Sequence, residues 1–238
     1  MKVLLVTNSD FGIRNTVGYR ATPIAKRLNK NGLLKSVLCR DFKAGVIPQS
    51  KLRIVIPSGN IIPKILSGLE LYITKRIDAR SIQVMLFEFF SKKGINGADI
   101  MHNWEYSDVI NARAKKRGMK VVQDVPIALR NIVKEINERE QMFPKENETI
   151  SRKTIRAFKL ADKIIAPSTF VKESLIKINI PSSRITVVPY GVDCEEFTPG
   201  KKRRKFTVSF AGNVSHRKGI KYLIKAWKSV CKKDMELR

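Results

Sequence analysis

The sequence has few of the residues that hold small proteins together covalently or bind metals. Its three cysteines, Cys39, Cys194 and Cys231, are odd in number and far apart, with no CxxC pair and no neighbouring pair of histidines. This spacing argues against a disulfide framework and against a zinc site. We therefore expect a protein of a reduced, cytosolic compartment, with no metal and no other cofactor.

Long apolar runs are also missing. The run from Val84 to Phe90 is interrupted by Glu88 and is far too short to span a bilayer. Near the start, only the four apolar residues 3–6 precede the charged Asp10 and Arg14, so we expect no signal peptide. These features predict a cytoplasmic protein that is soluble or at most peripheral on the cytosolic face of a membrane.

Acidic residues are scarce, because 21 Asp and Glu stand against 47 Lys and Arg, which gives a net charge of +26. Such an excess favours anionic partners: nucleotide diphosphates, an anionic membrane surface or nucleic acid. A lysine-rich surface with no particular partner is the alternative. No helix-turn-helix, RNP or KH pattern accompanies the charge, so nucleic acid is the least favoured of these partners.

Short apolar runs alternate with segments of helical spacing over the first 190 residues. This alternation predicts an α/β domain with a doubly wound, mostly parallel sheet. Ser168 is the expected N-cap of a helix over residues 170–178, and another helix is expected to end at Asn31-Gly32. The expected strands are residues 3–6, 36–39, 52–56, 98–106 (running out into a loop), 120–126, 163–166 and 185–193, and residues 127–151 are expected to be largely helical.

A second domain is expected to begin after a basic linker. Residues 206–210 resemble a short buried strand, and Ile220, Leu223, Ile224 and Trp227 recur at helical spacing. We expect a first domain over residues 1–199, a linker over 200–205, and the first strand and helix of a second domain over 206–238. Because one strand cannot form a Rossmann half-domain, residues 206–238 are expected to be poorly ordered by themselves or packed elsewhere.

Candidate functional residues follow three of the expected strands. His102, Asn103 and Asp124 stand at carboxyl ends of strands, where a doubly wound sheet gathers its functional groups. His102 is a candidate catalytic residue, with a purely structural histidine as the alternative. Gly12 and Gly18 do not form a GxGxxG fingerprint, but together with Asp124 they are candidates for an acceptor or phosphate loop. A helix start is the other interpretation of Gly18.

The turn from Gly212 to Gly219 joins the expected strand of the second domain to its helix. Such a turn places free backbone N–H groups and the positive end of a helix dipole together, and Arg217 and Lys218 add two cations. With Asn213, these residues predict a phosphate or diphosphate site. The alternative is that the glycines only let the chain turn and that the cations are solvated.

The region from Ile61 to Lys93 is apolar at mixed helical spacing and interleaved with Lys and Arg. A basic amphipathic segment of this kind can lie on an anionic membrane surface. The other interpretation, which we favour, is a helix that faces the core and keeps a basic side in water.

Two segments together resemble a known family. ADKIIAPSTFVKESLIKINIPSSRITVVPYGVDCEEFTP (residues 161–199), followed by FAGNVSHRKGIKYLIKAW (residues 210–227), resembles the hinge region of group 1, or family 4, retaining glycosyltransferases of the GT-B fold. Over residues 1–160 the resemblance is looser and rests on the glycine loop, ADIMH and VVQDVP. It implies two Rossmann-like domains across a cleft, with the acceptor bound mainly by the first and the donor mainly by the second.

The resemblance also assigns roles to residues. It implies that the turn over residues 212–219 cradles the donor diphosphate, and Lys218 matches the basic residue of the family's RKG motif. Asn213 stands where the family often has arginine. His102 matches the first position of the family's His-x-His motif, and Trp104 occupies the second. Fixed cations and helix-end N–H groups can stabilise a departing nucleotide diphosphate without a metal.

The resemblance leads us to expect a retaining glycosyltransferase that uses a nucleotide-diphosphate sugar, with a lipid-linked or polysaccharide acceptor. By this resemblance, the family's Glu-x7-Glu segment would lie beyond residue 238. We therefore expect the chain alone to transfer sugar weakly or not at all, and a separate chain carrying that half as a further partner. The alternative is a non-catalytic module that descends from such an enzyme and binds a sugar, a lipid or a partner subunit.

Overall fold

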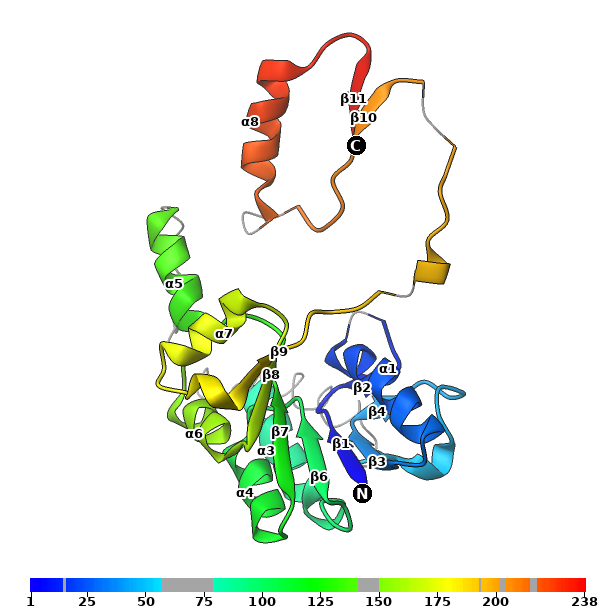
Figure 1. Cartoon of the computed structure of the whole chain (residues 1–238), viewed down its shortest axis with the longest axis vertical. Helices are drawn as coiled ribbons and strands as arrows, with labels where there is room; N and C mark the ends of the chain where they lie inside the picture. The colour runs from blue at the N-terminus through cyan, green and yellow to red at the C-terminus, as the bar shows by residue number, and fades with distance from the viewer. Residues whose placement is uncertain (15, 57–78, 141–149, 193, 202–203, 215–217) are drawn as a thin grey trace, which may run out of the picture. The chain divides into compact units, whose positions relative to one another are not determined.

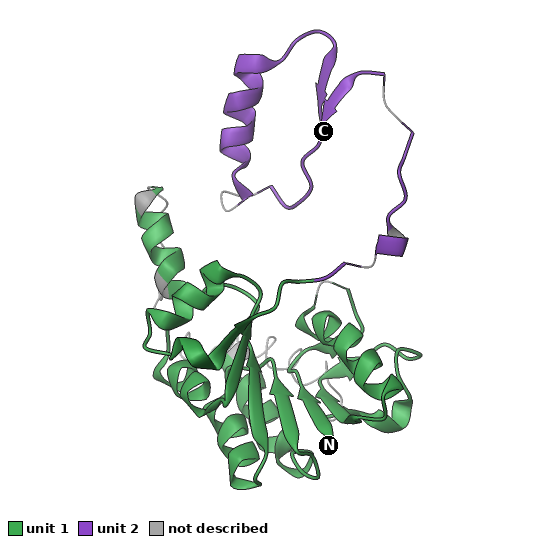
Figure 2. Ribbon diagram, viewed as in Figure 1, with its two compact units in different colours: residues 1–190 green, residues 191–238 purple. Residues whose placement is uncertain are grey.

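The computed structural model describes the chain except for residues 15, 57–78, 141–149, 193, 202, 203 and 215–217. The chain divides into two compact units, residues 1–190 and residues 191–238 (Figure 2). The limits predicted from the sequence, at residues 199 and 206, remain predictions.

Unit 1 is built on a seven-stranded sheet (Figure 1) in which every strand runs parallel to its neighbours. The strand order is β5-β3-β1-β6-β7-β8-β9. All four residues of β1 are buried, as expected for a parallel strand covered on both faces. The strands are β1 (Val3–Val6), β3 (Leu34–Cys39), β5 (Leu52–Ile54), β6 (Ile100–Asn103), β7 (Lys120–Asp124), β8 (Lys163–Ala166) and β9 (Ile185–Val187). The predicted doubly wound parallel sheet is thereby confirmed.

The helices of unit 1 begin at polar side chains that accept hydrogen bonds from the first turn. Ser168 accepts from the N–H of Val171 at 3.3 Å, which confirms it as an N-cap, and Thr16, Ser107 and Ser151 cap three other helices in the same way. The helices are α1 (Val17–Lys30), α3 (Ala79–Phe90), α4 (Asp108–Lys116), α5 (Arg130–Arg139), α6 (Arg152–Leu160) and α7 (Thr169–Ile176). A separate two-stranded pair joins β2 (Asp10–Phe11) to β4 (Asp41–Phe42).

Two hydrophobic clusters form the core, and β1 contributes to both. Leu4 and Val6 belong to a cluster that includes residues of α3, α4, α6 and α7, whereas Val3 and Leu5 belong to a second cluster with residues of α1. Alternate side chains of a strand point to opposite faces, so the sheet is buried on both sides. Burial on both faces explains why β1 reads as an uninterrupted apolar run.

The strand order reverses between β1 and β6. From β1 the chain first adds β3 and β5 on one side and then returns to place β6 on the other side. In open α/β sheets, ligands bind at such a reversal, outside the carboxyl ends of the two strands. A ligand site is therefore expected at the residues that follow Val6 and at the end of β6.

Unit 2 is a single β-α-β unit made of β10 (Phe206–Val208), α8 (Ile220–Val230) and β11 (Met235–Leu237), and its two strands are parallel. The sequence interpretation anticipated one strand and missed β11, because three residues after Lys232-Lys233-Asp234 give no periodic signal. No residue of unit 2 that the structure describes is buried. A β-α-β unit alone does not enclose a hydrophobic core.

Helices α3 and α5 lie in two segments that were expected to be helical. The prediction over Ile61–Lys93 lies outside the described residues up to residue 78; from there, α3 buries Phe87 and leaves Met85 and Phe89 exposed. Of residues 127–151, α5 covers ten, and 141–149 lie outside the described part. Helix α4 was not predicted, although the Ser107 cap and the spacing of Ile110 and Ala114 carry its signal.

Candidate functional site

The carboxyl ends of β1, β6 and β7 bring together residues that lie far apart in the sequence. In the parallel register, Leu5 pairs with His102, and His102 pairs with Val122. The residues just beyond β1 therefore lie beside the end of β6, and Asp124, the last residue of β7, lies on the other side of β6. The structure places His102 and Asp124 at one edge, as the sequence predicted for functional groups of this sheet.

His102 lies between a carboxylate and an indole ring. Its Nε2 is 3.4 Å from Oδ2 of Asp124, which is within the range of an ion pair when the imidazole is protonated. No hydrogen bond is formed by Nε2 among the described residues. The imidazole also stacks on Trp104, with ring centroids 3.9 Å apart and planes inclined by 24°. These contacts fix the orientation of a ring that is 7% exposed.

Three buried polar atoms at this edge have no hydrogen-bond partner in the part of the chain that the structure describes. They are Thr7 Oγ1 and Asn8 Oδ1, which follow β1, and His102 Nε2. The backbone N–H of Asn8 is satisfied, because it donates to Glu105 Oε1 at 2.8 Å. Buried polar atoms are rarely left without a partner, and each one costs about 1–3 kcal/mol. All three belong to residues at the carboxyl ends of β1 and β6, beside the reversal point where sheets of this kind bind ligands.

A ring of buried amide side chains lies next to this site. Asn103 Nδ2 donates to Asn111 Oδ1 at 2.8 Å, and Asn111 Nδ2 donates to Gln123 Oε1 at 3.0 Å. Gln123 Nε2 closes the ring by donating to the carbonyl oxygen of Asn103 at 2.9 Å. All three side chains are fully buried. The ring links β6, α4 and β7 immediately beside His102 and Asp124.

Tyr190, the last residue of unit 1, is bound to two other parts of that unit. Its hydroxyl donates to the carbonyl oxygen of Pro126 at 2.7 Å and accepts from Arg20 Nη1 at 3.0 Å. Burial raises the pKa of Tyr190, the charge of Arg20 opposes that shift, and the charge of Asp124 adds to it. Tyr190 is therefore a neutral donor at ordinary pH and fixes the point where the chain leaves unit 1.

Tyr106 lies within electrostatic range of the carboxylates of Asp124 and Glu105. Burial raises its pKa well above the ordinary value, and the negative charges of Asp124 and Glu105 raise it further. The ring packs edge-on against Phe158, with centroids 5.0 Å apart. The phenol stays neutral, so it adds no charge to the site.

The two predicted loop glycines have local roles in the backbone. Gly12 has φ +78°, and a Cβ on it would lie 2.9 Å from Cγ2 of Val46. Gly18 is the second residue of α1, where a Cβ would lie 2.4 Å from the carbonyl oxygen of Asp10. Both positions require glycine for reasons of packing and conformation. Their assignment to an acceptor or phosphate loop remains a prediction.

In unit 2, the turn before α8 brings two predicted diphosphate residues together. Gly212 has φ +145°, and the position of a Cβ on it would be 3.5 Å from Cε of Lys218 and 3.9 Å from its Nζ. Asn213 and Lys218 are exposed. Helix α8 starts after Gly219, a residue with no side chain that could cap the first N–H groups. Arg217 lies outside the described residues.

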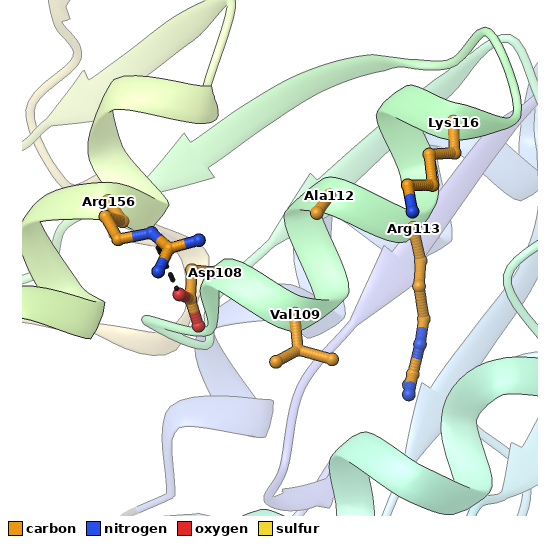
Figure 3. Close-up of a pocket in the computed structure, with 6 residues that line it drawn as sticks. All are labelled: Asp108, Val109, Ala112, Arg113, Lys116 and Arg156. Atoms are coloured by element: carbon orange, nitrogen blue, oxygen red, sulfur yellow. Dashed lines mark ion pairs between the residues drawn. The ribbon is translucent and has the colours of Figure 1, made fainter.

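A hollow of about 290 Å³ lies elsewhere in unit 1, on the outer side of α4 (Figure 3). Its lining includes the ion pair between Arg156 Nε and Asp108 Oδ2, which are 3.4 Å apart. The other lining side chains are those of Val109, Ala112, Arg113 and Lys116. It contains none of the residues that the sequence predicted for a site.

The sequence interpretation missed several residues of the site at the sheet edge. Thr7 and Asn8 carried a usable signal, since they directly follow a buried strand of a doubly wound sheet. No sequence signal marks Asn111, Gln123 or Tyr190, because the residues to which they hydrogen-bond are far away in the sequence. Only the packing of α4 and α6 on the sheet identifies an asparagine on a helix as part of this arrangement.

Neither a metal-binding cluster nor a membrane-spanning helix occurs among the described residues. In these residues, no group of three or more His, Cys, Asp or Glu side chains is arranged to hold a metal ion. None of the helices in the same part of the chain has the length and apolar character needed to cross a membrane. The expected absence of a metal remains a prediction.

Comparisons with known proteins agree with this architecture. The family model described as Glycosyltransferase Family 4 matches residues 24–196, and the chain belongs to this family. No curated protein matches the sequence. The family and the GT-B type of fold expected from the sequence are thereby confirmed.

Three solved structures illustrate the likeness, and each alignment covers 100% of this chain. The lipopolysaccharide outer core galactosyltransferase WaaB in its apo form has a TM-score of 0.56 at 14% identity, with 60% of its chain covered. HepE from Anabaena, in complex with UDP and glucose, has a TM-score of 0.57 at 14% identity, with 60% of its chain covered. Sucrose-phosphate synthase from Thermosynechococcus elongatus has a TM-score of 0.58 at 12% identity, with 61% of its chain covered. At these identities the likeness shows the fold alone, and the chain spans about 60% of these proteins.

Proposed function

We propose that the protein takes part in glycosyl transfer from a nucleotide-diphosphate sugar to a hydroxyl group of an acceptor, with retention at the anomeric carbon. The observation that carries this proposal concerns Thr7 Oγ1, Asn8 Oδ1 and His102 Nε2, at the carboxyl ends of the two strands that flank the reversal point of the sheet. These buried atoms have no hydrogen-bond partner among the described residues. A polyhydroxyl acceptor offers both donors and acceptors to such atoms. Membership of Glycosyltransferase Family 4 supports the same reaction class.

In the proposed reaction, the acceptor oxygen forms a bond to the anomeric carbon while the bond from that carbon to the diphosphate oxygen breaks. The proton of the acceptor hydroxyl passes to the departing diphosphate, on the same face of the sugar. His102, oriented by Asp124 and Trp104, hydrogen-bonds the substrate and holds it in place. Among the described groups of this site we identify no enzyme nucleophile that would form a covalent intermediate.

For the donor, we propose that the turn around Gly212 and Lys218 binds the diphosphate. Lys218 lies beside Gly212, and the first N–H groups of α8 have no side-chain cap at Gly219. Negative charge that develops on the leaving group is stabilised by such fixed groups. HepE, which shares the fold, has been crystallised with UDP, so UDP is the first nucleotide to test.

The test is the thermal unfolding of the chain in the presence of UDP, GDP and ADP. One of them is expected to raise the midpoint, because a ligand at about 100 times its Kd stabilises the native state by about 2.7 kcal/mol. Lys218→Ala should abolish the shift, while Lys228→Ala, in the last turn of α8, should retain it. If no nucleotide shifts the midpoint, or both variants respond like the parent chain, the donor assignment is wrong.

A second candidate is a non-catalytic module that binds a sugar, a lipid or a partner subunit. It is favoured by the absence of buried residues in the described part of unit 2. A transfer assay with labelled nucleotide sugars separates the two functions, first on the chain alone and then with a separate chain that carries a Glu-x7-Glu segment. A module would bind and never transfer.

We also propose a class of acceptor and a membrane surface to which the protein binds. A lipid-linked or polysaccharide acceptor fits a hydroxyl-binding site, and a net charge of +26 suits an anionic membrane surface. Co-sedimentation with anionic and neutral vesicles measures the latter directly. Equal binding to both kinds of vesicle would show that the positive charge of the protein does not direct it to anionic membranes.

A further inference from the structure

Asn111 lies in α4, outside the strands that carry His102 and Asp124, yet it contacts their direct neighbours in the sequence. Its Oδ1 accepts from Asn103, the residue after His102, and its Nδ2 donates to Gln123, the residue before Asp124. The same Nδ2 also donates to the carbonyl oxygen of Ala157 in α6 at 2.9 Å. One side chain thus connects two strand ends and two helices.

Every donor of this side chain is used, and so is its oxygen. Its two N–H groups have two acceptors, and the side chain is fully buried. A buried amide is costly unless all of its groups are paired, and networks that are fully paired are rigid. In a parallel sheet, a fixed link between the ends of adjacent strands holds those ends at one separation. Asn111 therefore determines how His102 faces Asp124.

The network also reaches the indole ring that stacks on the imidazole. Asn103 Nδ2 donates to the carbonyl oxygen of Glu105, and the N–H of Glu105 donates back to Asn103 Oδ1, both at 2.9 Å. These two bonds close a tight turn around the intervening residue, Trp104, whose ring stacks on His102. The orientation of the indole thus depends on Asn103, which is itself held by Asn111.

We propose that Asn111 is a positioning residue that sets the geometry of His102 between Asp124 and Trp104. The proposal rests on the proposed function in one respect, because it takes His102 as the group that contacts the substrate. Asn111 itself touches no substrate; it acts through Asn103 and Gln123. Replacing it leaves Gln123 Oε1 and the carbonyl oxygen of Ala157 without this donor, so the strand ends are free to shift.

The stack provides a readout that needs no substrate. Protons of an imidazole stacked on an indole resonate upfield, because they lie in the ring current of the indole. The chain has two histidines, so the variant His216→Asn leaves His102 as the single histidine signal. In this background, Asn111→Ala is expected to remove most of the upfield displacement of the His102 ring protons. Ser174→Ala is the matched control.

Ser174 is also fully buried and hydrogen-bonded, with its Oγ donating to Val171 at 2.6 Å in α7. Its loss should lower stability without moving the His102 signals. The proposal is wrong if folded Asn111→Ala keeps the displacement of the parent chain, or if Ser174→Ala removes it equally. Should Asn111→Ala not fold, Gln123→Met, which breaks the same ring from β7 with little change in volume, is measured by the same criteria.

The activity of the enzyme gives a second, separable measurement. Where transfer is detected, Asn111→Ala is expected to lower kcat about 100-fold while KM changes little, since a displacement near 1 Å at the reacting centre has that effect. A failure to detect transfer would count against the proposed function and would leave the measurement of His102 geometry valid.

Discussion

The carbonyl oxygen of Asp10 lies 2.4 Å from the position that a Cβ on Gly18 would occupy. This approach is possible only because glycine has no side chain, and it lets the start of α1 pack directly on β2. The hydroxyl of Thr16, which caps α1, lies 2.7 Å from the same carbonyl oxygen. Glycine at position 18 is thus required by helix packing, whether or not a ligand approaches this loop.

Gly18→Ala is expected to destabilise the protein by about 1–3 kcal/mol or more, because the nearest atoms are backbone atoms that cannot move aside. Urea unfolding measures the change. Gly200→Ala is the control, since a Cβ there meets nothing within 4 Å and should alter stability by less than about 0.5 kcal/mol. Equal stability of the two variants would contradict the packing argument.

Asp124→Asn tests the pairing with His102 while keeping the shape of the side chain. It removes the negative charge 3.4 Å from Nε2. In an active enzyme, we expect kcat to fall about 100-fold, because a displacement near 1 Å of a group that holds the substrate has that effect. The steady-state rate of sugar transfer is the measurement, and the exposed Asp234→Asn is the control. Unchanged transfer in Asp124→Asn would show that the pair is structural.

Cys39 is expected to resist thiol reagents in the native protein. Burial, together with the negative charges of Asp41 and Asp10, raises its pKa to about 12, so the reactive thiolate is scarce at pH 8. Cys194 and Cys231 are exposed and should react. Mass spectrometry after labelling should count two modified thiols in the native chain and three in urea. Three modified thiols in the native chain would contradict the buried position of Cys39.

Asp162 should make stability depend on acid pH. Burial by itself would raise its pKa, but hydrogen bonds from Lys115 Nζ and from the N–H of Val121, helped by the charges of Lys115 and Lys120, lower it below the ordinary 3.8. A carboxylate with a lowered pKa contributes stability that is complete above its unfolded pKa and is lost as the pH falls through its folded pKa.

The comparison is therefore between the parent chain and Asp162→Asn, by urea unfolding at pH 7 and at several values below 3.8. The difference in unfolding free energy between them should be largest at pH 7 and shrink steadily on acidification. A difference that stays constant across this range would show that Asp162 stabilises the fold through contacts that do not depend on its charge.

Much of the fold was predictable, and the reason is visible in particular elements. The continuous apolar run of β1 and the matching strand β8 were predicted at their observed limits, and Ser168 was recognised as a cap. Such signals are local, because burial on both faces and N-capping depend on residues close in the sequence. Strand β11 was not predicted because it is only three residues long. Helix α4 was missed although the Ser107 cap and the spacing of Ile110 and Ala114 indicate it.

The sequence by itself determined the α/β class, the family and the presence of His102 and Asp124 at the ends of two strands. The tertiary structure alone decided that Asp124 faces His102, that Trp104 stacks on the imidazole, and that Asn111 joins both strand ends. Local periodicity records which residues are buried and in which element they lie. Contacts between side chains that are many residues apart depend on strand order and helix packing, which arise only when the whole unit folds.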